Sequence, residues 1–234
     1  MKTTFLQLGI LLAMSIIVVG FTSCNGDEPI PTDSSVIRAT NVVGNTNEIA
    51  FVRNLHGGRP PWQTIAEAPF QNNGFTMQLP ETLPNHFLTH ISDGLVPFGG
   101  NFLDFTITGN IETRWLRPFD FAPGFTAFDK DGVSIGSIFF GRDIENYDDN
   151  TIASWVYVTD DIIIAGETDV VCYGLSNSLC IQNFANLNLN KGWNLIYVHR
   201  LSVTNGDNIK ITHTFTSQRP SGKFSWRFIP TRFN

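Results

Sequence analysis

Alternation of apolar and polar residues with a period of two recurs through this chain and constrains it to β structure. The pattern is clearest in residues 193–216, where two successive strands are expected. No segment with a helical period exceeds three turns, so we predict an all-β fold. The residues that share one face of these strands are Trp193, Leu195, Tyr197, His199, Leu201 and Val203 in the first, and Ile209, Ile211, His213 and Phe215 in the second.

The composition agrees with strands. Apolar residues make up 42% of the chain and charged residues only 15%, a balance that argues against disorder. Residues 80–91 are the one candidate for a helical turn, and they are too few for a stable helix. We expect an antiparallel β-sandwich, built either as one large unit or as two tightly packed β units. The irregular aromatic stretch from Trp115 divides these into residues 36–116 and 117–234, with one continuous unit as the alternative.

The connection between the two strands of residues 193–216 can be predicted from the pairing of their apolar faces. Residues 205–206 are Asn-Gly, which favours a two-residue turn, but that turn would pair Leu201 with Lys210. Matching the apolar faces instead places Val203 opposite Ile209 and requires a connection of three or five residues. The same register places His199 opposite His213.

A serine motif in residues 132–136 has to be weighed as a sign of a hydrolase. Gly-Val-Ser-Ile-Gly matches the G-x-S-x-G pattern of a nucleophile elbow, which requires a strand, a sharp turn and a helix around the serine. Here the turn comes first, because Asp129–Gly132 is a strong hairpin signal, and Ser134 falls inside an expected strand. Hydrolase activity is therefore the least favoured function.

The first 24 residues read as an export signal with a lipid-attachment site. Lys2 precedes an apolar run over residues 5–19, about the length of a signal-peptide core. Gly-Phe-Thr-Ser-Cys at residues 20–24 resembles the lipobox of bacterial lipoproteins, although Phe21 stands where that motif usually has Leu, Val or Ile. The resemblance implies cleavage after residue 23 and acylation, palmitate included, at Cys24. An ordinary secretory signal with an incidental cysteine, or a single-pass anchor, is the alternative.

The residues after Cys24 indicate a tether and a location. Residues 24–35 are polar, contain prolines and lack periodicity, so we expect a flexible tether. Asn25 is not the aspartate that favours inner-membrane retention, and Asp27 and Glu28 resemble the acidic export signals of surface lipoproteins of the Bacteroidetes type. The resemblance implies a cell-envelope protein in the outer membrane, with exposure at the cell surface as an open possibility.

Two further stretches resemble phrases that recur in secreted lipoproteins of that type. They are residues 74–84, Gly-Phe-Thr-Met-Gln-Leu-Pro-Glu-Thr-Leu-Pro, and residues 188–194, Asn-Leu-Asn-Lys-Gly-Trp-Asn. The families concerned are largely uncharacterised, β-rich surface proteins. The resemblance implies fold and location, and it includes no catalytic residue.

The cysteines fit an exported protein. Apart from Cys24 the chain contains only Cys172 and Cys180, at a spacing that suits a disulfide closing a small loop. Two free thiols are the alternative. A zinc site would require further thiolates or histidines at ligand spacing, and none lies beside this pair.

The residues that favour ligand binding are two tryptophans and two histidines. Trp62 and Trp115 lie in stretches expected to be loops, where exposed rings could stack on a glycan or peptide, or else close the ends of the sandwich. His199 and His213, if opposed, could share a metal ion or a proton. Two ligands do not complete a zinc site, so we expect a hydrogen-bonded pair and no metal or cofactor.

These observations predict a lipid-anchored cell-envelope protein with a non-enzymatic binding or assembly role. Its expected partners are the membrane, through the lipid, and a glycan or a protein. Nucleic acid is excluded because the formal charge is −6 and no basic cluster is present. A carbohydrate-binding accessory lipoprotein is the first alternative.

Overall fold

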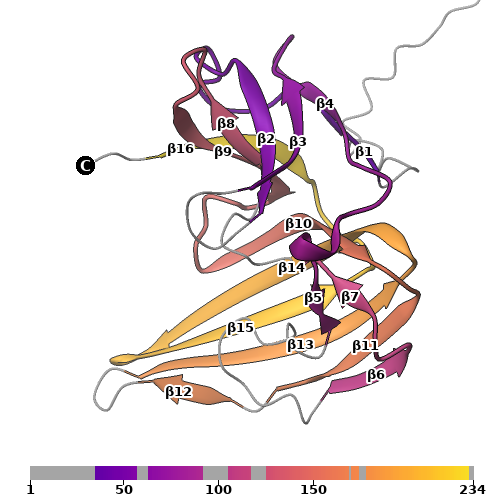
Figure 1. The fold of residues 1–234 in the computed structure, drawn as a ribbon. Helices are drawn as coiled ribbons and strands as arrows, with labels where there is room; N and C mark the ends of the chain where they lie inside the picture. Colours follow the sequence, from indigo (N-terminus) through magenta and orange to yellow (C-terminus); the bar gives the residue numbers. More distant parts are fainter. Residues whose placement is uncertain are drawn as a thin grey trace, which may run out of the picture.

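The computed structural model describes residues 35–56, 63–91, 105–116, 125–168, 170–173 and 178–231. Within these ranges the regular elements are strands, together with η1 (Asn85–Phe87), one turn of 3-10 helix in the segment expected to hold a helical turn (Figure 1). The prediction of an all-β fold is confirmed. The strands are β1 (Val36–Ala39), β2 (Phe51–His56), β3 (Gln63–Pro69), β4 (Phe75–Gln78), β5 (Thr89–His90), β6 (Phe105–Gly109), β7 (Arg114–Trp115), β8 (Phe125–Phe128), β9 (Ser134–Arg142), β10 (Asp149–Val158), β11 (Ile162–Glu167), β12 (Val171–Tyr173), β13 (Leu179–Leu189), β14 (Gly192–Asn205), β15 (Asn208–Thr216) and β16 (Ser225–Pro230).

One large sheet contains most of the strands, and β1 pairs with β4 in a separate small sheet. The main path runs β3-β2-β8-β9-β10-β14-β15-β13-β11-β6, with β16 paired to β9 and β12 paired to β13. The strand pairs are antiparallel except for β13 and β15. In Figure 1 the strands β2, β3, β8, β9 and β16 form the upper part, and β15, β13, β11, β6 and β12 extend away from it below.

Strands β10 and β14 are buried on both faces over residues 155–158 and 196–198, and each face belongs to a different apolar cluster. Trp155 and Tyr157 of β10 belong to the first cluster, whereas Val156 and Val158 belong to the second. On β14 the alternation repeats, with Tyr197 in the first cluster and its two neighbours, residues 196 and 198, in the second. A strand that is covered on both sides has few polar positions, which explains the unbroken apolar runs at residues 155–158 and 195–198.

Aromatic rings dominate the first cluster, where Trp226 of β16 is at the centre. Its ring centroid lies 5.0 Å from that of Phe140, 5.6 Å from that of Phe75 and 6.0 Å from that of Trp155. Phe125 contacts the same group at 5.9 Å from Trp226. These rings come from five different strands, so their burial holds the upper strands against β10 and β14.

Aliphatic side chains dominate the second cluster, on the opposite face of β10 and β14. β11 and β13 supply five of its buried residues, Ile162, Ile164, Ala185, Leu187 and Leu189. Phe215 of β15 is also a buried member of this cluster. The short strands β5 and β7 pair with each other, and β7 also pairs with the end of β10.

The division expected between residues 36–116 and 117–234 does not coincide with a break in the sheet. Strand β2 pairs with β8, β6 pairs with β11, and β7 pairs with β10, so three strand pairs join the two ranges.

The hairpin predicted at Asp129–Gly132 is present between β8 and β9. The carboxylate oxygen Oδ1 of Asp129 accepts hydrogen bonds from the backbone N–H groups of Asp131 and Val133, at 2.9 and 2.8 Å. Gly132 has a φ of +80°, the conformation for which a glycine was expected there. Ser134 begins β9 and pairs with Phe128, so it lies on a strand and not at an elbow.

The register predicted for β14 and β15 is wrong. Asn205 pairs with Asn208 around a two-residue turn at residues 206–207, and Val203 lies opposite Lys210 instead of Ile209. The prediction assumed that both apolar sets occupy one face of the hairpin. In the structure Tyr197 packs into the first cluster, whereas Phe215 packs into the second, so the two sets point to opposite faces.

Candidate functional site

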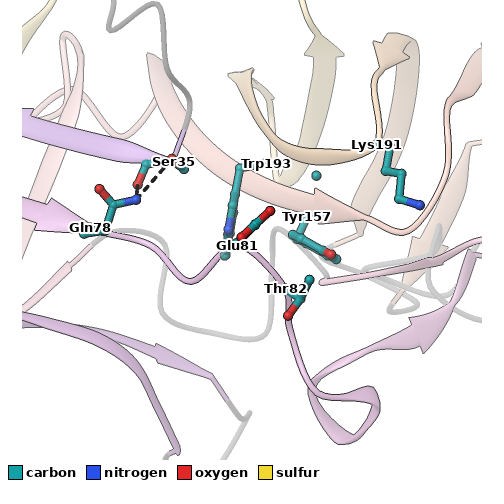
Figure 2. Close-up of a pocket in the computed structure, with 8 residues that line it drawn as sticks. Ser35, Gln78, Glu81, Thr82, Tyr157, Lys191 and Trp193 are labelled. Carbon is teal, nitrogen blue, oxygen red and sulfur yellow. Dashed lines mark hydrogen bonds between the residues drawn. The ribbon is translucent and has the colours of Figure 1, made fainter.

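A cleft of about 530 Å³ opens beside the start of β14, a volume within the range of small-molecule sites. Figure 2 shows Ser35 and Gln78 at one end of the cleft, Lys191 at the other, and Trp193, Glu81 and Tyr157 between them. The residues that line it are Ser35, Gln78, Glu81, Thr82, Tyr157, Lys191, Gly192 and Trp193.

Two aromatic side chains form the base of the cleft. Tyr157 of β10 and Trp193 of β14 are directly paired across the sheet, and their rings meet edge to face with centroids 5.4 Å apart. Both residues are buried, so only their edges border the cleft. The indole N–H of Trp193 donates a 2.7 Å hydrogen bond to the carbonyl oxygen of Pro80. That bond fixes the segment after β4 against the start of β14.

The turn that carries Lys191 is held by several hydrogen bonds. The side-chain amide of Asn194 donates to the carbonyl oxygens of Asn190 and Gly192, at 2.7 and 3.0 Å, and its oxygen accepts from the backbone N–H of Asn190. The N–H of Lys191 donates to a carboxylate oxygen of Asp161 at 2.7 Å. Gly192 has a φ of +98°, which a residue with a Cβ rarely adopts. These hydrogen bonds and the conformation of Gly192 together fix the turn that carries Lys191.

The opposite wall begins at the first residue that the structure describes. The carbonyl oxygen of Ser35 accepts a 2.7 Å hydrogen bond from the backbone N–H of Leu79, and the side-chain amide of Gln78 lies 3.2 Å from the Ser35 hydroxyl. The cleft therefore lies where the chain enters the folded domain from its N-terminal segment.

The cleft offers hydrogen-bonding groups of mixed character. Glu81 supplies one carboxylate and Lys191 one ammonium group, and hydroxyl and amide groups from Ser35, Thr82 and Gln78 complete the polar lining. Its volume and lining suit a small polar ligand. Within the described ranges no group of three or more His, Cys, Asp or Glu residues is arranged to hold a metal ion.

The structure corrects the prediction for Trp115 as an exposed stacking ring. Its side chain is 3% exposed and packs in the second apolar cluster. The reason is that the stretch expected to be a loop contains β7, in which Trp115 pairs with Thr89 on one side and with Val158 on the other. Trp62 and Cys24 lie outside the described residues.

The prediction that His199 and His213 face each other is also wrong. His199 pairs with Thr214, and His213 pairs with Arg200, so the two imidazoles project from opposite faces of the sheet. Nε2 of His199 lies 2.9 Å from a carboxylate oxygen of Asp149. On the other face, Nδ1 of His213 lies 3.2 Å from the side-chain oxygen of the buried Asn183. The pair cannot share a metal ion or a proton.

The expected disulfide is present. Cys172 of β12 and Cys180 of β13 are directly paired across the two strands, with Cα atoms 4.0 Å apart, and their sulfur atoms are bonded. The bond closes the loop between these strands at the far end of the lower sheet from the cleft.

Of the residues singled out from the sequence as binding or metal sites, the structure describes Trp115, His199 and His213, and none of these three lines the cleft. The signal that could have found it was the pair of stretches resembling recurring lipoprotein phrases. Residues 74–84 supply Gln78, Glu81 and Thr82, and residues 188–194 supply Lys191 and the residues that follow it. More than a hundred residues separate the two stretches, and the bond from Trp193 to Pro80 joins them directly.

No family model, curated protein sequence or solved structure matches this chain. In the part of the chain that the structure describes, no helix has both the length and the apolar character needed to cross a membrane.

Replacing Trp193 with Phe should loosen the cleft. The variant keeps a ring against Tyr157 but removes the N–H that bonds to Pro80, so we expect a loss of about 1 kcal/mol in unfolding free energy. Amide exchange at Leu79 should accelerate, because this segment loses its bond to β14. Tyr157→Phe is the matched control and should leave exchange at Leu79 unchanged. Equal exchange rates in wild type and Trp193→Phe would show that the bond does not hold the wall.

His213 should make stability depend on pH. Burial, with a smaller contribution from the charge of Arg200, lowers the pKa of His213 from 6.5 to about 4. Between these values the unfolded chain binds a proton that the folded chain does not, so unfolding free energy should fall as the pH drops from about 6.5 towards 4, by at most about 3 kcal/mol. Above pH 6.5 the group should contribute no slope.

Denaturant titrations of wild type and His213→Gln at pH 7, 5.5 and 4.5 measure this effect. The variant has no group that titrates there, so the part of the slope due to His213 should disappear. An identical loss of stability in both proteins would contradict the assignment.

Proposed function

We propose that this chain is an exported, lipid-anchored protein of the bacterial cell envelope with a non-enzymatic binding role. The cleft at the start of β14 is its candidate ligand site. The proposal combines the N-terminal signal, the positions of the cysteines and the geometry of the cleft.

The observation that carries the proposal is the distribution of the three cysteines. Cys172 and Cys180 are bonded to each other, which leaves Cys24 as the one remaining cysteine of the sequence. A structural disulfide is typical of proteins that fold in an oxidising compartment, which supports export. The remaining cysteine stands at the lipobox-like position, where a thiol is required for acylation.

The length of the N-terminal segment relates the anchor to the cleft. Residues 24–34 precede Ser35 and number eleven, so at full extension they can span at most about 40 Å. Because Ser35 itself lines the cleft, a lipid on Cys24 would keep the cleft within that distance of the membrane surface. Three acyl chains would make release from the bilayer negligible, since each buried methylene contributes about 0.8 kcal/mol.

The lining of the cleft supports binding and not catalysis. Covalent catalysis needs a nucleophile with a base in hydrogen-bond contact. Among the residues that line the cleft, the hydroxyl of Ser35 lies 3.2 Å from the side-chain amide of Gln78, and an amide is not a base. A single carboxylate, from Glu81, lacks the second carboxyl that glycoside hydrolysis uses. Hydrogen-bonding groups over buried aromatic edges suit reversible binding of a polar ligand.

Replacing Cys24 with Ala tests the anchor. Wild-type protein expressed with its own signal should incorporate an alkyne-labelled palmitate analogue and enter the detergent phase of a Triton X-114 extract. The variant should incorporate no label and remain in the aqueous phase, because it lacks the thiol to which lipid is attached.

The double variant Cys172→Ala with Cys180→Ala is the control for the other two cysteines, and it should be labelled as strongly as wild type. Labelling of Cys24→Ala, or an unlabelled wild type, would contradict lipid attachment at this residue.

A further inference from the structure

The disulfide between Cys172 and Cys180 lies at an edge of the lower sheet. Strand β12 pairs with β13 over three residues, and the two bonded cysteines form the middle pair. Among the described strands β12 has β13 as its one neighbour, and Figure 1 shows it at the bottom of the lower sheet. The side of β12 that faces away from β13 is therefore a sheet edge within the described ranges.

The two bonded cysteines differ in exposure and in surroundings. Cys172 is exposed, whereas Cys180 is half-buried because β13 lies between β12 and β15. Lys210 of β15 stands directly opposite Cys180, so its side chain leaves the same face of the sheet. A positive charge at this place favours a thiolate on Cys180. An incoming thiol therefore has access to the sulfur of Cys172, and Cys180 is the better leaving group.

Strand β12 adds little apolar surface to the core. None of its three side chains is buried, and Val170, just before it, is 46% exposed. Because apolar burial is the main stabilising contribution to a strand at a sheet edge, three residue pairs with so little of it hold β12 weakly. The disulfide supplies the covalent part of the attachment.

The chain is fixed firmly just before β12. Thr168 is buried, and its backbone N–H donates a 2.8 Å hydrogen bond to the carbonyl oxygen of Asn183. The hydroxyl of Thr168 accepts a 3.0 Å hydrogen bond from the backbone N–H of the same residue. A separation of β12 from β13 would therefore stop at Thr168 and leave the rest of β13 in place.

We propose that the disulfide between Cys172 and Cys180 is a thiol-exchange site, at which a dithiol reduces the bond and releases β12 from β13. Three observations carry the inference: the exposed sulfur at a sheet edge, the lysine opposite the leaving sulfur, and the small buried surface of β12. Exposed disulfides are commonly the labile ones, whereas structural disulfides resist reduction. The site is separate from the cleft and from the proposed lipid attachment at Cys24.

The exchange takes place in two steps. One thiolate of the dithiol attacks the sulfur of Cys172, so the bond between the two cysteines breaks and a mixed disulfide forms on Cys172. Cys180 leaves as a thiolate and takes up a proton. The second thiolate of the dithiol then attacks its own partner sulfur in the mixed disulfide, which releases Cys172 as a thiol. Two electrons and two protons pass to the protein, and the dithiol becomes a cyclic disulfide.

The rate of reduction by dithiothreitol tests whether the bond is accessible in the folded protein. The full chain, purified in mild detergent, is quenched with N-ethylmaleimide, and mass spectrometry gives the alkylated fraction of Cys172 and Cys180. We expect the rate in native buffer to lie within about tenfold of the rate in denaturant. A bond that is reached only after unfolding should react at least about a thousandfold more slowly, because the unfolded fraction is that small.

Glutathione, a monothiol, tests which sulfur is attacked. At early times tandem mass spectrometry should locate the glutathione adduct on Cys172 and the maleimide on Cys180, because attack occurs at the exposed sulfur. Peptides containing these two residues are separate from any that contain Cys24, so the result does not depend on lipid attachment.

Hydrogen exchange of the oxidised and reduced proteins tests the release of β12. Peptides from residues 171–173 and 179–181 should exchange at least about tenfold faster after reduction, since they lose their pairing. Exchange at Asn183 should stay unchanged, because Thr168 still holds it. The double variant Cys172→Ser with Cys180→Ser is the matched control. It should exchange as the reduced protein does, with or without dithiothreitol.

Three outcomes would overturn the inference. They are reduction that requires denaturant, a glutathione adduct on Cys180 in place of Cys172, and equal exchange of residues 171–173 in the oxidised and reduced proteins. Each of these would leave palmitate labelling at Cys24 and the amide exchange of the cleft untouched, so the proposals fail separately.

Discussion

Pairing of β10 with β14 is the interaction on which the rest of the structure depends. Ten consecutive residue pairs join the two strands, from Asp149 opposite Leu201 to Val158 opposite Gly192. At residues 155–158 and 195–198 alternate side chains enter the aromatic cluster on one face and the aliphatic cluster on the other. Both clusters depend on the pairing of β10 with β14, because each cluster uses these two strands as one of its walls. Apolar side chains therefore cover this strand pair on both faces, and their removal from water stabilises it.

The candidate cleft lies at one end of the ladder between β10 and β14. At one end Tyr157 and Trp193, the pair next to the last, form the base of the cleft, and the bond to Pro80 brings the segment after β4 over it. On its other edge β14 forms a hairpin with β15, from Tyr197 opposite Thr216 to Asn205 opposite Asn208. The central strand pair therefore positions the base of the cleft, whereas Glu81, Thr82 and Lys191 come from the segment after β4 and from the turn before β14.

The sequence allowed the fold class, the hairpin at Asp129–Gly132 and the disulfide to be predicted, since each depends on local pattern or spacing. Strand β13 was missed because Asn183 and its neighbours at 186 and 188 are depleted in strands, although their alternation with apolar residues was a readable signal. The register predicted for β14 and β15 was wrong because a strand that is buried on both faces has no single apolar side to match with its neighbour. The prediction that Trp115 lies in a loop was wrong because its stretch becomes a strand only through long-range pairing with β10.

Hydrogen exchange followed by mass spectrometry in increasing denaturant tests most directly whether β10 and β14 unite the two clusters. Peptides from residues 153–158 and 193–198 should exchange slowest. Peptides from β16, in the aromatic cluster, and from β11, in the aliphatic cluster, should converge on the same opening free energy as denaturant rises, because both clusters share one wall. If β11 and β13 opened with a lower free energy while β10 and β14 stayed protected up to the transition of β16, the clusters would be independent units and the account would be contradicted.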